Sequence, residues 1–302
     1  MAALNDDPFD IAYFARNLDR RREEGHQTTL ILGSRASALF RSDTFYEIMQ
    51  QYGNPSFGQK APVKKFEECY TLLTKKGNFN IREIDSILNL ALENMPLSPA
   101  DLYLAALIVQ RFFDVVISTS LDDFLWRALR RLGVHEESVE VYDGYNDSYE
   151  DQNRAEKARR LFLLVNAFGQ LTTRGYKVQR ENYFKERQAL KELIWEHTQN
   201  DVLCLGYDPV WDAELGKVFH PVGGTLWYIN EEELSLFSDD DAQREIVRRV
   251  NPDCSYDYFL ENLYPRCGGT TSAHSITLHY LFHEILTLKE AIASLSRHTL
   301  AT

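Results

Sequence analysis

The 302-residue chain has few cysteines, no long apolar run and no excess of positive charge. Its four cysteines, Cys69, Cys204, Cys254 and Cys267, are far apart, which argues against a disulfide scaffold and fits a reducing compartment. No run of about 18 apolar residues is present, so we expect no membrane span. The first residues, MAALNDDPFDIAYF, lack the basic start and apolar stretch of a signal peptide. We therefore expect a cytoplasmic protein.

The charge balance argues against nucleic acid as the main partner. The formal net charge is -12, and an acidic surface repels a phosphate backbone. Two basic stretches, residues 16–25 and 156–160, mix both signs of charge and are predicted to be solvated helix faces. His279 and His283 share one face of a predicted helix, but Cys254 and Cys267 are too widely spaced for a compact zinc module. We expect no bound metal.

The hydrophobic pattern predicts an α/β fold. Short strands that are apolar throughout alternate with amphipathic segments, which is typical of a parallel sheet with helices on both faces. After residue 236 the pattern changes, and residues 239–302 are predicted to be helices only. We therefore divide the chain into a main domain, 1–236, and a helical C-terminal extension, 237–302. Strands are predicted at 28–33, 114–119, 139–144, 160–169, 201–208 and 224–230. Helices are predicted at 8–25, 37–53, 63–75, 80–94, 98–112, 121–133 and 182–199, and 145–160 is a helix or an exposed loop.

The segment LILGSRASALF, residues 30–40, predicts a phosphate-binding turn. Gly33 and the small residues Ser34 and Ser37 would let the backbone approach a ligand at a helix N-terminus, where free N–H groups favour an anionic pyrophosphate. Gly206 follows a later strand and would likewise leave room for a ligand to approach the backbone. Asp122 or Asp123 would accept hydrogen bonds from ribose hydroxyls or cap the next helix. In the alternative interpretation, Gly33 only makes a tight turn and the aspartates only cap.

Four segments, in this order, resemble the sirtuin-like family of bacterial NAD-hydrolysing proteins. LILGSRASALF stands where the family has a Gly-Ala-Gly-x-Ser turn after its first strand. DVVISTSLDDFLWRAL stands where the family has a strand, then the motif T-x-N-x-D, then a helix. LFLLVNAFGQL matches strand and Lys-x-His-Gly, and VLCLGYDPVWDAEL matches strand, Gly-x-Ser and a later Asp. LWYIN matches the closing strand. The resemblance covers residues 26–232 and implies a Rossmann-like fold with NAD over the carboxyl ends of the strands.

The sequence departs from this family at four ligand-facing positions. Phe168 stands where the family has the His that is associated with cleavage, and Phe cannot accept a proton. Ser120 stands in place of an Asn and is too short to reach the same atoms. Arg35 replaces the second Gly of the first turn, and Asp208 replaces the Ser of Gly-x-Ser. The Arg35 guanidinium would either pair with a phosphate or fill the pocket itself.

These departures predict a degenerate member of the family that has lost NAD hydrolysis. The resemblance implies a role in bacterial antiphage defence, with a protein partner or a homo-oligomer, in which the chain binds a nucleotide or serves as a scaffold. The alternative is an active NAD glycohydrolase that depletes NAD and uses Ser120, Asp122, Asp208 or His220 in the lost roles. The residues predicted to hold NAD or a related nucleotide are Gly33, Ser34, Arg35, Ser37, Asp122, Phe168, Gly206 and Asp208.

Overall fold

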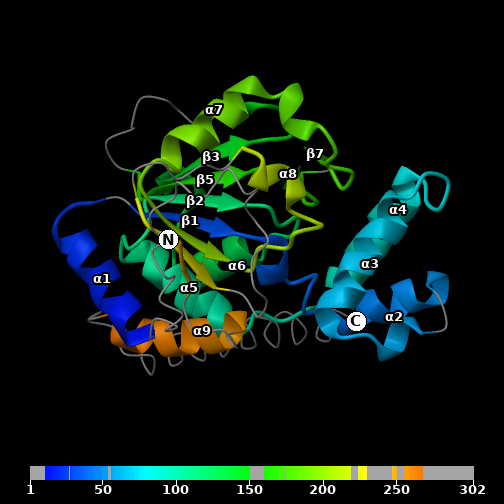
Figure 1. Cartoon of the computed structure of the whole chain (residues 1–302), viewed down its shortest axis with the longest axis horizontal. Coiled ribbons are helices and arrows are strands. Elements are labelled where there is room, and N and C mark those ends of the chain that lie inside the picture. The colour runs from blue at the N-terminus through cyan, green and yellow to red at the C-terminus, as the bar shows by residue number, and fades with distance from the viewer. Residues whose placement is uncertain are drawn as a thin grey trace, which may run out of the picture.

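A computed structural model of the chain describes residues 11–26, 28–53, 56–149, 160–173, 175–218, 224–229, 247–249 and 255–267. One mixed sheet runs through the centre, with helices on both of its faces (Figure 1). The fold is therefore the predicted α/β, Rossmann-like arrangement. Within the described parts of the chain, no helix is both long enough and apolar enough to cross a membrane.

The sheet has eight strands in the order β10-β9-β8-β1-β2-β5-β3-β4. All neighbours pair in parallel except β3 and β4, which form an antiparallel pair. Leu32 is in register with both Ser118 and Leu205, and Ser118 with Asn166, so the carboxyl ends of four central strands share one edge. The strands are β1 (Thr28–Leu32), β2 (Val115–Ser118), β3 (Val139–Asp143), β4 (Ser148–Tyr149), β5 (Phe162–Asn166), β8 (Asp201–Leu205), β9 (Leu226–Ile229) and β10 (Val247–Arg249).

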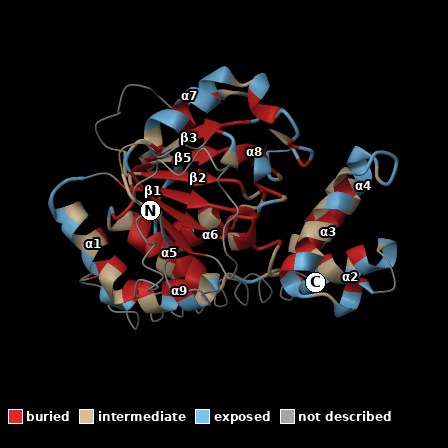
Figure 2. Ribbon diagram, in the orientation of Figure 1, coloured by how far each residue is buried: buried red, intermediate tan, exposed pale blue. Residues whose placement is uncertain are grey.

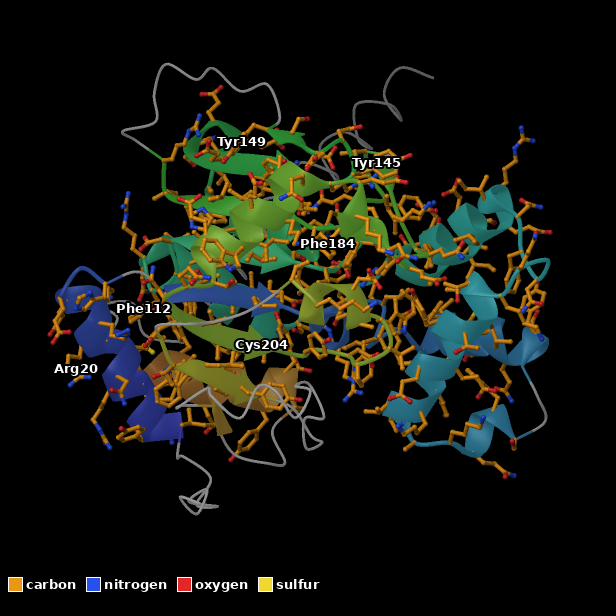
Figure 3. All side chains as sticks on the ribbon, turned by 45° about the horizontal axis from the view of Figure 1, so that its top comes forward. Arg20, Phe112, Tyr145, Tyr149, Phe184 and Cys204 are labelled. Atoms are coloured by element: carbon orange, nitrogen blue, oxygen red, sulfur yellow. The ribbon has the colours of Figure 1, made fainter. Side chains whose placement is uncertain are left out.

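Alternate residues of each strand enter two separate cores. Leu30, Val116 and Leu203 pack on one face of the sheet, and Ile31, Ile117 and Cys204 pack on the other. Because side chains alternate along a strand, an apolar run such as TTLIL is buried on both faces. Figure 2 shows the resulting buried centre, and Figure 3 places Cys204 within it.

The first core is closed by α1 (Ile11–Glu23), α5 (Pro99–Val109), α6 (Phe124–Arg131) and α9 (Tyr256–Leu263). The second core is closed by α2 (Asp43–Tyr52), α3 (Pro62–Thr74), α4 (Ile81–Leu92), α7 (Gln188–His197) and the short α8 (Ala213–Gly216). In Figure 1, α2, α3 and α4 gather beyond the end of the sheet where β1 stops. Ser42, Asn80 and Ser98 cap α2, α4 and α5 through their side chains, as their residue types favour.

Several local predictions are wrong. Residues 37–42 do not continue a helix from the Gly33 turn, because a 3-10 turn at Ser34–Ala36 intervenes and α2 starts at Asp43. Residues 148–149, predicted to be helix or loop, form edge strand β4. In the sheet, β5 lies between β2 and β3, an order that the sequence pattern does not predict. A two-stranded sheet of β6 (Gly169–Gln170) and β7 (Gly175–Tyr176) was also not predicted.

The C-terminal region is not purely helical. Strand β10 extends the main sheet by pairing with β9, which contradicts the prediction of helices only over residues 239–302. Helix α9 packs against α1 and α5, and its Phe259, Leu260 and Leu263 are fully buried in the first core. The boundary at residue 236 stays a prediction, but the described residues beyond it join the sheet and its core. The predicted helix that carries His279 and His283 lies outside the described residues.

We predict that α9 unfolds together with the main domain. Replacing Phe259 with Ala removes a fully buried ring and should lower the free energy of unfolding by about 3–5 kcal/mol, in one cooperative urea transition. Tyr258→Ala, at the half-exposed neighbouring position, should change it by less than about 0.5 kcal/mol. A separate early transition in the Phe259→Ala variant would show instead that α9 belongs to an independent unit.

Candidate functional site

The candidate site lies where the sheet topology reverses. The chain leaves β1 toward β2 on one side and later returns to place β8 on the other side of β1. In open α/β sheets, ligands bind in the crevice at the carboxyl ends of two such strands. Gly33 follows β1 and Gly206 follows β8, so the two predicted glycine turns meet at this point.

Each glycine makes room for the other turn. A Cβ on Gly33 would come under 3.0 Å from the Gly206 carbonyl oxygen, and a Cβ on Gly206 would come equally close to the Ala36 nitrogen. Gly206 also has a φ of +70°, in the left-handed region that favours glycine. The close approach that the sequence predicts toward a ligand is therefore present, but it is made to the chain itself.

Every backbone N–H from Gly33 to Ala38 has an acceptor within the chain. The Gly33 and Arg35 amides donate to carbonyls of the β8 turn, at 2.9 and 2.8 Å, and those of Ala36 and Ser37 close the 3-10 turn. The Ser34 amide donates to Asp212 Oδ2 and the Ala38 amide to Asp122 Oδ2, each at 2.8 Å. The groups that were expected to hold a pyrophosphate are thus hydrogen-bonded, two of them to carboxylates.

Asp212 lies where an anion would be held. Its Oδ2 accepts the amides of Ser34 and Asp208, both at 2.8 Å, and its Oδ1 accepts Ser34 Oγ at 2.5 Å. Arg180 Nη1 completes the set at 3.0 Å from Oδ1. The carboxylate is fully buried. Burial raises the pKa of Asp212, and this effect is opposed by the charge of Arg180 and by the Ser34 donors.

Arg180 links this carboxylate to the position where the family has its His. The guanidinium lies 3.9 Å from the centre of the Phe168 ring, and it also donates to the carbonyl oxygens of Trp211 and Thr119 at 2.7 and 2.8 Å. Burial lowers the pKa of Arg180, while Asp212 opposes that shift. Among the described residues, no acceptor faces Arg180 Nε, so part of the cost of burying the cation is not offset. Phe168 therefore serves as the packing partner of a buried cation.

A second buried ion pair joins Arg35 and Asp208, two further residues that differ from the sirtuin-like pattern. Arg35 Nε donates to Asp208 Oδ2 at 2.8 Å, and its Nη2 lies 3.5 Å from Glu67 on α3. Asp208 Oδ1 accepts the amides of Val210 and Trp211, so the carboxylate also closes its own turn. Of the two roles predicted for Arg35, pairing with a phosphate or filling the space, the structure shows the guanidinium paired with carboxylates of the chain.

Two small cavities remain beside the turn. One has a volume of about 30 Å³ and is lined on its polar side by Ser37, Asp101, Ser118, Ser120, Asp122, Asn166, Gln170 and Tyr256. The other, of about 10 Å³, lies toward Arg180 and Trp211 and shares Ser120 and Asp122. The larger one has room for about two water molecules, whereas ligand pockets typically measure roughly 300–1,000 Å³.

Asp122 is held by the backbone on both sides. Its Oδ2 accepts the Ala38 amide and its Oδ1 accepts the Phe124 amide at 3.2 Å, so it braces the β1 turn against the start of α6. Burial raises the pKa of Asp122. This capping role corresponds to the alternative interpretation of the sequence.

The structure brings most of the predicted site residues to one edge of the sheet. Ser120 and Asp122 line both cavities, whereas Phe168, Arg35 and Asp208 are buried in packing or ion pairs. His220 lies outside the described residues. Arg180 was not predicted, because it comes from a loop that carries no motif. Asp212 was noted in the fourth segment, but its spacing from Asp208 gave no sign that it would turn back toward Ser34.

The residues present do not fit a dinucleotide in this arrangement. A pyrophosphate would meet the carboxylates of Asp212 and Asp208 at an amide cradle that is already hydrogen-bonded. Among the described residues that line the larger cavity there is no Lys, Arg or His, and Asp101 and Asp122 are present. The described residues also contain no cluster of His, Cys, Asp or Glu suited to a metal ion. The described residues of this edge hold a folded turn rigidly, and each of the amides from Gly33 to Ala38 already has an acceptor within the chain.

Comparisons with known proteins give similarity of fold. No protein-family model matches the chain, and no curated protein sequence matches it. In contrast, 68 solved chains are similar to it in structure. One of them, from the work named "Structural Basis for the Mechanism and Regulation of Sir2 Enzymes", is 13% identical, with a TM-score of 0.48 over 85% of this chain and 97% of that chain. At this identity and TM-score, the likeness assigns no activity to this chain.

We predict that the Arg180–Asp212 pair is required for stability. Asp212→Asn removes one charge and leaves Arg180 buried without its counter-ion, which should lower the free energy of unfolding by about 3–5 kcal/mol in urea titrations. The double variant Arg180→Met/Asp212→Leu should lose less unfolding free energy than the sum of the losses in Arg180→Met alone and Asp212→Leu alone. As a control, Glu136→Gln in the exposed pair with Arg130 should change it by less than about 1 kcal/mol. Strict additivity of the Arg180 and Asp212 changes would contradict the coupling.

Proposed function

We propose that the chain is a sirtuin-like domain that does not hydrolyse NAD and that works by binding protein, as a subunit of a bacterial defence assembly. One observation carries the proposal: the turn expected to hold a pyrophosphate is filled by the Asp212 carboxylate and its partner Arg180. The motifs LILGSRASALF and DVVISTSLDDFLWRAL support the family resemblance, and the defence context comes from that resemblance.

The chemistry around the cavities supports the absence of turnover. Cleavage of the nicotinamide–ribose bond needs a polar group that positions or activates the attacking oxygen, and such help typically contributes a factor of about 10² to 10⁴. Phe168 is buried against Arg180 and cannot do this. Both oxygens of Asp122 accept backbone amides, and Ser120 Oγ lies 3.4 Å from the Asp122 amide. No group in this set is both basic and unoccupied.

The alternative, an active NAD glycohydrolase, would have to use the same cavity. Its candidate residues Ser120 and Asp122 do line that space, but the volume of about 30 Å³ is far below that of a dinucleotide site. Activity would therefore require this cavity to merge with the smaller one, which Arg180 lines, and Arg180 would have to move. We favour the non-hydrolysing function because the buried ion pair opposes that movement.

The prediction is that the purified protein releases no nicotinamide from NAD above a no-protein control, at high protein concentration, over hours, and with the products of neighbouring genes added. The physical reason is the occupied turn together with the absence of a base at Phe168. Nicotinamide release followed by chromatography measures this directly. Turnover that is lost in Ser120→Ala or Asp122→Ala, while the folded fraction by circular dichroism is unchanged, would overturn the proposal and favour the glycohydrolase.

A further inference from the structure

We propose that the chain assembles head to tail, with an apolar and basic tip of one copy bound to an aromatic and acidic surface of a second copy. This inference rests on the proposed function, because it names the partner of the interaction subunit. The tip lies at the far end of the α2–α4 helices and comprises Tyr52, Lys75, Lys76, Phe79, Ile81 and Arg82. The acceptor surface lies on α7 and β4 and comprises Tyr149, Glu192, Trp195 and Glu196.

The tip gathers apolar side chains at the surface. The Tyr52 ring at the end of α2 packs edge-on against Phe79, with ring centres 4.9 Å apart. Tyr52 is nevertheless 55% exposed, and Ile81, two residues after Phe79, is 73% exposed. Single exposed apolar residues are ordinary, but a contacting aromatic pair beside an exposed Ile forms a patch. Burying it on a partner would remove this area from water.

The tip is also locally positive in a chain of net charge -12. Lys75, Lys76 and Arg82 are exposed, and none of them forms an ion pair with the part of the chain that the structure describes. Glu83 is the one carboxylate of residues 75–83, and it accepts the Asn80 amide at 2.7 Å in the capping box of α4. The three cations therefore attract an acidic partner.

The acceptor surface has the complementary character. Trp195 on α7 is 52% exposed and Tyr149 on β4 is 40% exposed. Glu192 and Glu196 flank Trp195 on the exposed side of the helix, and Lys191 offsets one of their charges. The Leu190 amide of α7 donates to Asp147 Oδ1 at 2.8 Å, in the turn between β3 and β4, which places α7 next to this hairpin. Tyr and Trp are among the residues that most often anchor interfaces.

The two surfaces cannot satisfy each other within one copy. Figure 1 shows α7 and the α3–α4 connection at different ends of the molecule, and Figure 3 shows Tyr149 far from α4 as well. A contact between different surfaces is heterologous, so each added copy again presents one tip and one acceptor surface. Repetition of this contact generates a ring or a filament.

Sedimentation velocity of the full chain over rising concentration tests the inference. The wild type should self-associate, and Lys75→Glu with Lys76→Glu should weaken association about tenfold or more, since two charge pairs become repulsive. Arg16→Glu with Arg20→Glu on α1 makes the same change in net charge away from both surfaces (Figure 3) and should have little effect. A monomeric wild type, or equal weakening in both double variants, would overturn the inference.

A mixing experiment then tests the head-to-tail geometry. The Lys75→Glu/Lys76→Glu variant keeps its acceptor surface, and a Trp195→Ala variant keeps its tip. At a concentration just sufficient for the wild type to associate, each variant alone should be mainly monomeric, and an equal mixture should form a dimer and nothing larger. Absence of a dimer in the mixture would contradict the pairing of these two surfaces. Nicotinamide release from NAD in the same samples reports separately on the proposed function.

Discussion

The buried ion pair between Arg180 and Asp212 holds the carboxyl edge of the sheet together. Asp212 binds the turns after β1 and β8 through the amides of Ser34 and Asp208. Arg180 reaches the end of β2 through the Thr119 carbonyl and covers the Phe168 ring after β5. Four central strands thus end on one pair of charges, and both partners are buried away from solvent. Removing one of the two charges therefore lowers the free energy of unfolding by far more than the intact pair contributes to it.

Three of the four residues that depart from the sirtuin-like pattern lie in buried contacts at this edge, whereas Asp212 falls on an aspartate of that pattern. Phe168 packs on the Arg180 guanidinium, and Arg35 pairs with Asp208. Arg35 and Asp208 form a second buried ion pair nearby, with Glu67 as a third partner. These changes convert a predicted ligand-binding edge into a rigid part of the fold.

The sheet was predictable because its strands are apolar on both faces. TTLIL, DVVIS and DVLCL can only be buried between two helical layers, and the limits of β1, β2 and β8 fall within three residues of the expected ones. The position of β5 between β2 and β3 was not predictable, because neighbouring strands of equal apolarity carry no signal of their order. The start of α2 was placed too early because the small residues after Gly33 fit a helix and a 3-10 turn equally well.

The candidate site was predictable in location but not in content. Gly33 and Gly206 mark the point where the topology reverses, whereas the loss of hydrolysis inferred from Phe168 and Ser120 stays a prediction. That Arg180 and Asp212 occupy the turn depends on contacts between residues far apart in the chain, such as Ser34 with Asp212, and no local pattern encodes them.

The most direct measurement is an NMR titration of the protein with NAD that follows the backbone amides of Ser34 and Asp208. Both donate to Asp212, so each reports on whether the carboxylate keeps its place. The account predicts that neither resonance moves as NAD is raised to saturating millimolar levels. Saturable shifts of both amides would mean that NAD displaces Asp212, and the central claim would be contradicted.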